Sequence, residues 1–311
     1  MSTYGAFVVF VIGLLMIIKG GDIFLNGAIG VAKITGISTG IIGATIVSIA
    51  TTLPELLVST IAAYEGLEDM CIGNAIGTYI SNIAFIIGIS SIIKPIKIDG
   101  NFNIKGIMMI SFLILFYILA MDGMITKKEG AILFSLVIFF LWANAVEHKK
   151  DDTKKNKLYL NKEDTSKNIV FFIVGGILVV TGSHLLLDSA VQIANFLHTP
   201  QNVISLTFLA IGSSLPELVT AITAIRKKEQ SISIGNILGA NIYNLTMILG
   251  LSALFSDDGI TIYRQTLTLD FSMALIVTLL FVGSGIFKKK ISRSMGFLLL
   301  FIYLVFIFAL F

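Results

Sequence analysis

The sequence predicts an all-α polytopic membrane protein with ten transmembrane helices in two inverted five-helix repeats. Composition is the first observation, because 56% of the 311 residues are hydrophobic and 13% are charged, whereas about 25% are charged in soluble domains. The second is a series of ten long apolar segments, and the third is a self-match of the chain at a shift of 162 residues. This composition excludes a water-soluble domain and a disordered chain.

The apolar segments are long enough to be membrane helices, which need about 20 mostly apolar residues each. Their apolar runs are continuous, as in Ile132–Leu141, whereas the strands of a membrane β-barrel alternate apolar and polar residues. The first segment has no positive leader and no small-residue cleavage site, so we expect a retained helix rather than a signal peptide. The ten predicted spans cover residues 5–30, 37–63, 70–93, 104–121, 129–146, 168–195, 202–225, 231–255, 265–287 and 293–311.

Positively charged residues are concentrated in alternate loops. The loops that follow spans 1, 3, 5, 7 and 9 hold 18 of the 22 Lys and Arg residues, and such loops face the cytoplasm. We therefore expect a cell-membrane protein whose two termini are extracellular. Near the cytoplasmic end of the first span, Lys19 and Asp22 are three residues apart and are expected to form a local ion pair.

The self-match joins two motifs that are too specific to arise from chance pairing of apolar residues. Leu53-Pro54-Glu55-Leu56 falls on Leu215-Pro216-Glu217-Leu218, and Gly73-Asn74 falls on Gly235-Asn236. Each copy holds five spans, an odd number, so the second copy enters the membrane from the opposite side. The predicted parts are a first repeat over 1–147 with its motif at 43–90, a cytoplasmic linker over 148–167, and a second repeat over 168–311 with its motif at 205–252.

Glu55 and Glu217 are the candidate binding residues, since an acidic side chain in the middle of a membrane helix is expensive and marks a functional site. Two hydroxyl residues lie three and four positions before each glutamate and share its helical face; they are Thr51, Thr52, Ser213 and Ser214. The proline directly before each glutamate, Pro54 or Pro216, lacks an N–H and so leaves the backbone carbonyl one turn earlier without its helical hydrogen bond. Carboxylate, hydroxyl and carbonyl oxygens suit hard cations such as Ca²⁺ and Na⁺.

Spans 3 and 8 add neutral oxygens to this set. Asn74, Thr78 and Asn82 recur every four residues and share one face, and Asn244 is the counterpart of Asn82 in span 8. The small-residue pairs Gly73/Gly77 and Gly235/Gly239 predict close helix packing beside them. Two ionised glutamates balance one Ca²⁺, two Na⁺ or two H⁺, so these residues predict competition for one site in a secondary transporter.

The paired motifs, hydroxyl-hydroxyl-Leu-Pro-Glu followed by Gly-Asn-x-x-Gly-x-x-x-x-Asn, resemble the α-repeats of the calcium/cation antiporter superfamily. The likeness is greatest to the prokaryotic sodium/calcium exchangers and covers all ten spans. It implies Ca²⁺/Na⁺ exchange by alternating access, with ion binding by Glu55, Glu217 and the hydroxyls. It also implies backbone ligands at Ser48 and Ala210. Two positions depart from the family pattern: Ala240, where a serine is usual, and Asn244, where an aspartate is usual.

Rival functions remain open at this point. An H⁺- or K⁺-dependent Ca²⁺ antiporter would use the same oxygens, and a cation channel is a further alternative. An enzyme is not expected, because the chain has no His-Glu-x-x-His motif and no histidine in the middle of a span. The net charge of +3 argues against nucleic-acid binding. We expect the lipid bilayer as the surroundings, no cofactor, no protein partner and a functional monomer.

Overall fold

The computed structural model describes residues 3–98, 102–152, 162–196 and 214–310, which form an almost entirely helical protein. Symbols beginning with η denote π-helical turns. The elements are α1 (Thr3–Thr35), α2 (Thr39–Ile42), η1 (Gly43–Val47), α3 (Ser48–Tyr64), α4 (Glu68–Ser81), η2 (Asn82–Ile87), α5 (Gly88–Ile93), β1 (Ile96–Lys97), α6 (Phe102–Ala120), β2 (Met124–Ile125), α7 (Lys127–Asp152), α8 (Lys162–Phe196), α10 (Leu215–Arg226), α11 (Gln230–Tyr243), η3 (Asn244–Ile248), α12 (Leu249–Phe255), β3 (Ile260–Thr261), η4 (Thr266–Asp270), α13 (Phe271–Lys288), β4 (Lys290–Ile291) and α14 (Arg293–Ala309).

Eight continuous helical segments in the described part are long and apolar enough to cross a membrane. They match eight of the predicted spans to within a few residues, although α1 and α8 are longer than expected. The helix α14 is also apolar and has 17 residues. For the predicted span over 202–225, the described residues contribute only α10, since 197–213 lie outside them.

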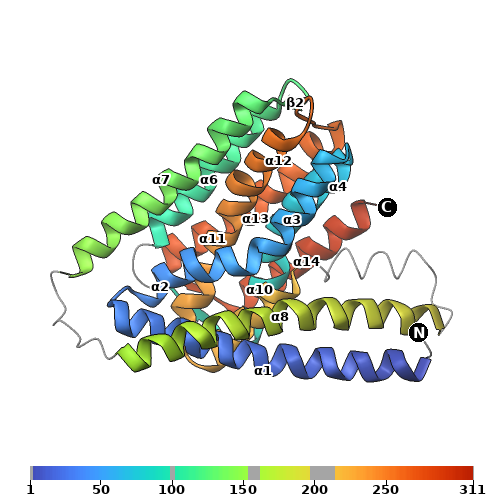
Figure 1. Cartoon of the computed structure of the whole chain (residues 1–311). Helices are drawn as coiled ribbons and strands as arrows, with labels where there is room; N and C mark the ends of the chain where they lie inside the picture. The colour runs from blue at the N-terminus through green and yellow to red at the C-terminus, as the bar shows by residue number, and fades with distance from the viewer. Residues whose placement is uncertain (1–2, 99–101, 153–161, 197–213, 311) are drawn as a thin grey trace.

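The helices form two layers that cross each other. The long helices α1 and α8 run side by side and lie across one end of the remaining bundle (Figure 1). Glycines allow their close approach, because a Cβ at Gly13 would lie 2.8 Å from the backbone nitrogen of Leu186, and one at Gly182 would lie 3.0 Å from the carbonyl oxygen of Gly13. The second layer includes α3, α4 and α11, and α3 carries four of the predicted site residues, Ser48, Thr51, Thr52 and Glu55.

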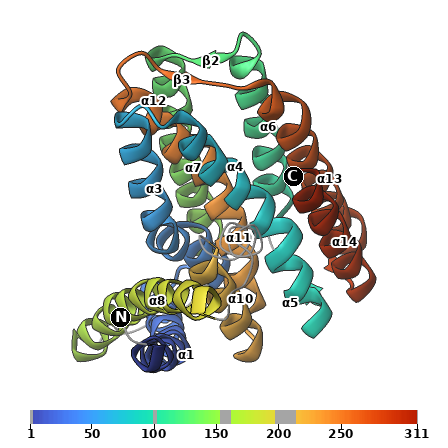
Figure 2. The same ribbon diagram turned by 90° about the vertical axis from the view of Figure 1, so that its right-hand side faces the viewer.

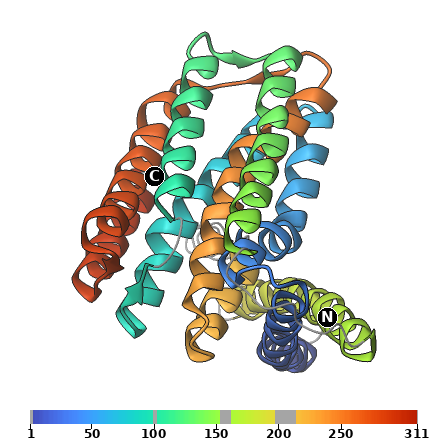
Figure 3. The same ribbon diagram turned by 90° about the vertical axis from the view of Figure 1, so that its left-hand side faces the viewer.

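Two short antiparallel ribbons tie loops together at opposite ends of the bundle. Ile96 pairs with Ile291 in one ribbon, joining β1 to β4, and β2 pairs with β3 in the other. The β2–β3 ribbon lies at the end away from α1 and α8, whereas the C-terminal ends of α5 and α10 lie at the other end (Figures 2 and 3). The loops predicted to be cytoplasmic after spans 3 and 9 are therefore neighbours in space.

Further hydrogen bonds join loops at the same two ends. The backbone nitrogen of Lys97 in β1 donates to Oε1 of Gln230 at 2.9 Å, which adds the loop after α10 to the first end. The backbone nitrogen of Thr261 in β3 donates to Oε2 of Glu68 at 3.0 Å, which adds the loop after α3 to the other end. The described loops are thus sorted into the two groups that the lysine and arginine pattern predicts.

The helical elements of the two halves correspond at the shift found in the sequence. Adding 162 to both bounds of α4 gives both bounds of α11, and the π-helical turns η2 and η3 follow directly. The shift is 166 for the start of the last helix of each half, since α7 begins at Lys127 and α14 at Arg293. The two ribbons are also equivalent, because β1 and β4 of one ribbon occupy the positions of β3 and β2 of the other in the opposite halves.

Asp22 has a different partner from the one expected. Its Oδ1 lies 3.4 Å from Nζ of Lys227, the residue after α10, and the same ammonium donates to Oδ1 of Asn26 at 3.0 Å. Asp22 and Asn26 are one turn apart on α1 and share a face. The expected local pair with Lys19 is therefore wrong, because the lysine at the end of α10 reaches that face and ties α1 to the bundle.

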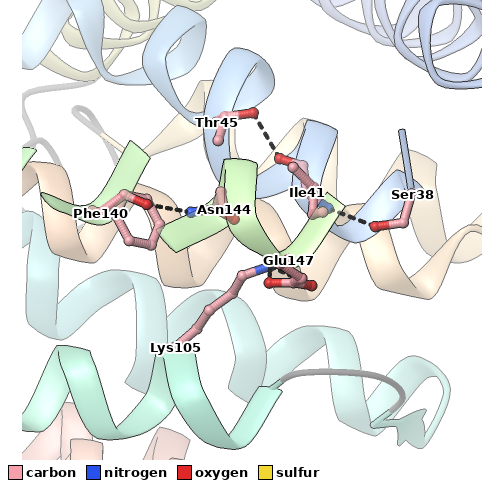
Figure 4. A network of polar contacts seen from close by, with 7 residues as sticks. All are labelled: Ser38, Ile41, Thr45, Lys105, Phe140, Asn144 and Glu147. Carbon is pink, nitrogen blue, oxygen red and sulfur yellow. Dashed lines mark hydrogen bonds and ion pairs between the residues drawn. The ribbon is translucent and has the colours of Figure 1, made fainter. Parts of the chain in front are cut away.

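A second ion pair lies between α6 and α7 (Figure 4). Nζ of Lys105 lies 3.2 Å from Oε2 of Glu147, with 8% and 13% of the two side chains exposed. One turn before the glutamate, Asn144 donates to the carbonyl oxygen of Phe140 at 2.8 Å. Lys105 is one of the 18 basic residues counted for the loops, but it lies inside α6 and is paired with Glu147, so it does not indicate which side of the membrane this end faces.

Candidate cation-binding site

The two glutamates of the repeated motif are buried in facing helices. Glu55 on α3 is 2% exposed and Glu217 on α10 is 0% exposed, and these two helices contact each other. None of the four carboxylate oxygens has a hydrogen-bond partner among the described residues. Unpaired buried carboxylates are expensive, so this arrangement calls for a compensating cation or proton.

The hydroxyls that precede Glu55 are buried beside it. Oγ1 of Thr52 donates to the carbonyl oxygen of Ser48 at 2.6 Å, and Oγ1 of Thr51 lies 3.3 Å from the same oxygen. The helix α3 continues through Pro54, and the irregular winding lies earlier, in the π-helical turn η1. Pro54 therefore removes one backbone hydrogen bond without ending the helix, and the two threonine hydroxyls bond to the carbonyl of Ser48 instead.

The second motif is described only in part. Ser213 and Ala210 lie outside the described residues. Ser214 is the N-cap residue of α10 and is 2% exposed, and its hydroxyl has no partner in the part of the chain that the structure describes. Glu217 follows in the first turn of this helix, where the unpaired backbone N–H groups favour negative charge.

Amide groups from η2 and η3, the turns that follow α4 and α11, complete the set of buried oxygens. Asn82 begins η2, which packs against α10, and Asn244 begins η3, which packs against α3. Both asparagines are fully buried, and Thr78 is 2% exposed. Oδ1 of Asn82 and both amide atoms of Asn244 have no partner among the described residues. Each amide therefore begins a turn that packs against the helix carrying the other repeat's glutamate.

Close helix packing was predicted at two glycine pairs and is found at Gly235/Gly239 on α11, whereas no described atom lies within 4 Å of a Cβ at Gly73 or Gly77. A Cβ at Gly235 would meet the carbonyl oxygen of Gly40, and one at Gly239 would meet that of Ala44. The approach brings Asn236 to the motif of the other half, where its Oδ1 accepts from Oγ1 of Thr51 at 3.2 Å. These glycines thus place one repeat's amides beside the other repeat's hydroxyls.

Three polar residues near this site were not among the predicted ligands. Asn74 donates to the carbonyl oxygen of Glu55 at 3.2 Å and to Oγ of Ser59 at 2.9 Å. Asn236 contacts Thr51, and Asn241 contacts Asn82. Asn74 and Asn236 were visible as a repeated pair. Asn241 was not, because the shift of 162 places it on Tyr79, which has no amide.

The chemistry of this set is that of a hard-cation site. Among the described residues there is no group of three or more His, Cys, Asp or Glu side chains, so the fixed charge comes from the two glutamates alone. The remaining groups are hydroxyl, amide and carbonyl oxygens, which are ligands for Ca²⁺ and Na⁺ rather than for zinc or copper.

The fold and the site together define a polytopic helical membrane protein with a buried, oxygen-lined pair of carboxylates. A family model described as "Sodium/calcium exchanger protein" matches residues 5–146 and 167–311. The chain belongs to this sodium/calcium exchanger family, a family of ion transporters whose substrates are Na⁺ and Ca²⁺. The resemblance inferred from the paired motifs is therefore confirmed.

Relatives match over nearly the whole chain. It is 31% identical to Inner membrane protein YrbG of Escherichia coli, with 87% of this chain and 86% of the relative covered. It is 28% identical to Sodium/calcium exchanger MaX1 of Methanosarcina acetivorans, with 98% of each covered. A structure of the sodium-calcium exchanger NCX_Mj, soaked with zero Na⁺ and Ca²⁺, aligns with a TM-score of 0.87 at 30% identity and covers 100% of both chains.

Proposed function

We propose that this protein exchanges Ca²⁺ for Na⁺ across the cell membrane by alternating access at a site near the membrane midplane. The observation that carries the proposal is the pair of buried glutamates from two equivalent motifs, with four carboxylate oxygens that lack partners among the described residues. Two negative charges are balanced by one Ca²⁺ or by two Na⁺, so the two ions compete for the same oxygens. Family membership supports this pair of ions.

The proposed ligands combine charged and neutral oxygens. The glutamates supply the charge, and hydroxyl, amide and backbone oxygens replace the water that a hard cation loses on binding. Ser48 and Ala210 are proposed to contribute backbone carbonyls. The full proposed set is Glu55, Glu217, Thr51, Thr52, Ser213, Ser214, Asn82, Asn244, Thr78, Ser48 and Ala210.

Alternating access follows from the proposed architecture of two inverted repeats, 1–147 and 168–311, of five spans each. The matching bounds of α4 with α11 and the equivalence of the two ribbons support this architecture. Inverted halves that move against each other expose one central site to each side in turn. The linker 148–167 is proposed to be cytoplasmic and the termini extracellular, with the monomer as the working unit.

The test is Ca²⁺ uptake into proteoliposomes that contain the purified full chain. A Na⁺ gradient directed outward is expected to drive uptake of radiolabelled Ca²⁺ at constant pH. Glu55→Gln and Glu217→Gln should each nearly abolish it, because either change leaves the site with one charge. Glu65→Gln, at an exposed position after α3, is the matched control and should transport normally.

Other outcomes would point to the rival functions. Uptake driven only by a pH gradient would indicate proton coupling, and a requirement for K⁺ would indicate K⁺ dependence. Downhill Ca²⁺ entry that needs no opposing ion would indicate a channel. Normal exchange in either glutamine variant would overturn the site.

A further inference from the structure

A chain of amide hydrogen bonds crosses the interface between the two halves, beside the proposed site. Nδ2 of Asn82 donates to Oδ1 of Asn241 at 2.9 Å, and Nδ2 of Asn241 donates to the carbonyl oxygen of Tyr79 at 3.2 Å. All three residues are 0% exposed. The chain therefore joins η2 and α4 of the first half to α11 of the second in a region closed to solvent.

The direction of this chain is fixed by the backbone carbonyl at its end. A carbonyl oxygen only accepts, so the atom of Asn241 that faces Tyr79 must be its amide nitrogen. Oδ1 of Asn241 then faces Asn82, and the atom of Asn82 that faces it must also be nitrogen. Oδ1 of Asn82 is left without a partner among the described residues. One backbone carbonyl thus decides which end of the Asn82 amide is available to an ion.

We propose that Asn241 is a positioning residue, which holds the Asn82 amide with its oxygen presented to the bound cation. The inference rests on the proposed cation site and assigns no direct ion contact to Asn241. An amide that is free to rotate presents its NH₂ group as readily as its oxygen, and the NH₂ group repels a cation. An oxygen that is already oriented requires no rearrangement when the ion arrives.

The amide hydrogen bond that orients Asn82 has no counterpart among the described residues of the other half. The residue equivalent to Asn241 in the first half is Tyr79, whose hydroxyl lies 2.8 Å from Oγ1 of Thr278 and offers no amide to Asn244. Accordingly, neither amide atom of Asn244 has a partner among the described residues. Among the described residues, Asn82 is held in one orientation by an amide and Asn244 has no such partner, so in this part of the chain the two equivalent asparagines differ despite the repeat.

A double-mutant cycle on Ca²⁺ half-saturation tests the proposal. Asn241→Leu has nearly the same size and removes both hydrogen bonds of the side chain. We expect the Ca²⁺ concentration for half-maximal uptake to rise about threefold to tenfold, the range that the net loss of one hydrogen bond spans. In the Asn82→Leu background the same change should add nothing, because no amide remains to be held. In the Asn82→Asp background it should also have little effect, since either orientation of a carboxylate presents oxygen.

The control is Asn144→Leu, which removes a buried asparagine that also donates to a backbone carbonyl but lies on α7 (Figure 4). The Ca²⁺ concentration for half-maximal uptake by this variant should equal that of the wild type. If Asn241→Leu does not give monodisperse protein, Asn241→Ala is measured in the same backgrounds. Unchanged half-saturation, or an equal shift with and without the Asn82 amide, would overturn the positioning role. If the wild-type protein shows no Na⁺-driven Ca²⁺ uptake, the proposed function is overturned instead.

Discussion

At the scale of single residues, the distinguishing feature of the site is buried oxygen without a partner. Most buried polar groups in proteins are hydrogen-bonded, yet the carboxylates of Glu55 and Glu217 and the amide of Asn244 have no partner among the described residues. Thr51 and Thr52 do have partners, because the hydroxyl of Thr52 bonds within α3 and that of Thr51 lies within reach of Oδ1 of Asn236 and the carbonyl of Ser48. The carboxylate and amide oxygens among these groups are ones that a cation would satisfy, whereas the threonine hydroxyls already have hydrogen-bond partners.

Asn244 provides a prediction at this scale. Asn244→Leu should lower the rate of Ca²⁺ uptake at low Ca²⁺, because it removes an oxygen and places an apolar group in a polar environment. Asn244→Asp should keep exchange activity and make it more sensitive to pH or to added K⁺, since a third carboxylate needs a proton or another cation for balance. The measurement is the initial uptake rate of both variants across pH and Ca²⁺ concentration. Wild-type behaviour of Asn244→Leu at every Ca²⁺ concentration would remove Asn244 from the ion pathway.

At the scale of elements, the sequence predicted which segments are helices better than how they are wound. Hydropathy located the described spans because a bilayer requires long apolar helices. It did not reveal the π-helical turns η1, η2 and η3, which begin at Gly43, Asn82 and Asn244. A π-helical turn changes the local hydrogen-bond pattern without changing composition. The partner of Asp22 was missed for a similar reason, since Lys227 is distant in sequence.

The contact between α11 and the first repeat gives a prediction at the element scale. Gly235→Ala should destabilise the protein by about 1–3 kcal/mol, the usual effect of overpacking, because its new Cβ would meet the backbone of Gly40. Gly283→Ala on α13 is the control, since no described atom lies within 4 Å of a Cβ there, and it should be neutral or slightly stabilising. Thermal unfolding in detergent compares the two variants. Equal midpoints would contradict the close contact.

At the scale of the whole molecule, the internal repeat was the most informative feature of the sequence. It singled out both glutamates and the paired asparagines before any contact was known, since equivalent positions of two inverted copies are expected to converge. It failed where the copies differ. Asn241 and Tyr79 occupy equivalent positions with unlike side chains, so comparison of the repeats could not show their mutual hydrogen bond. Differences between the two halves are therefore visible only in the contacts of the folded structure.

The sidedness of the molecule is the last prediction, and it depends on the two groups of loops. Without Lys105, 17 of the 22 Lys and Arg residues lie in or beside the loops that follow odd-numbered spans, and the ribbon that joins β1 to β4 brings two of these loops together at one end. The other ribbon joins loops with few positive charges at the opposite end. Because positive loops stay in the cytoplasm, the first ribbon should be inside and the second outside.

Cysteine labelling tests this orientation in intact cells. Cys71 is buried, so Cys71→Ala provides a background without competing thiols. In that background Glu65→Cys and Lys288→Cys each place a thiol at an exposed position, one at each end of the bundle. A membrane-impermeant maleimide added outside should label only the Glu65→Cys protein, and both should be labelled after permeabilisation. Labelling of Lys288→Cys from outside would reverse the orientation. Labelling of both from outside would mean that the two ribbons do not lie on opposite sides of the membrane, which is incompatible with spans that alternate in direction between them.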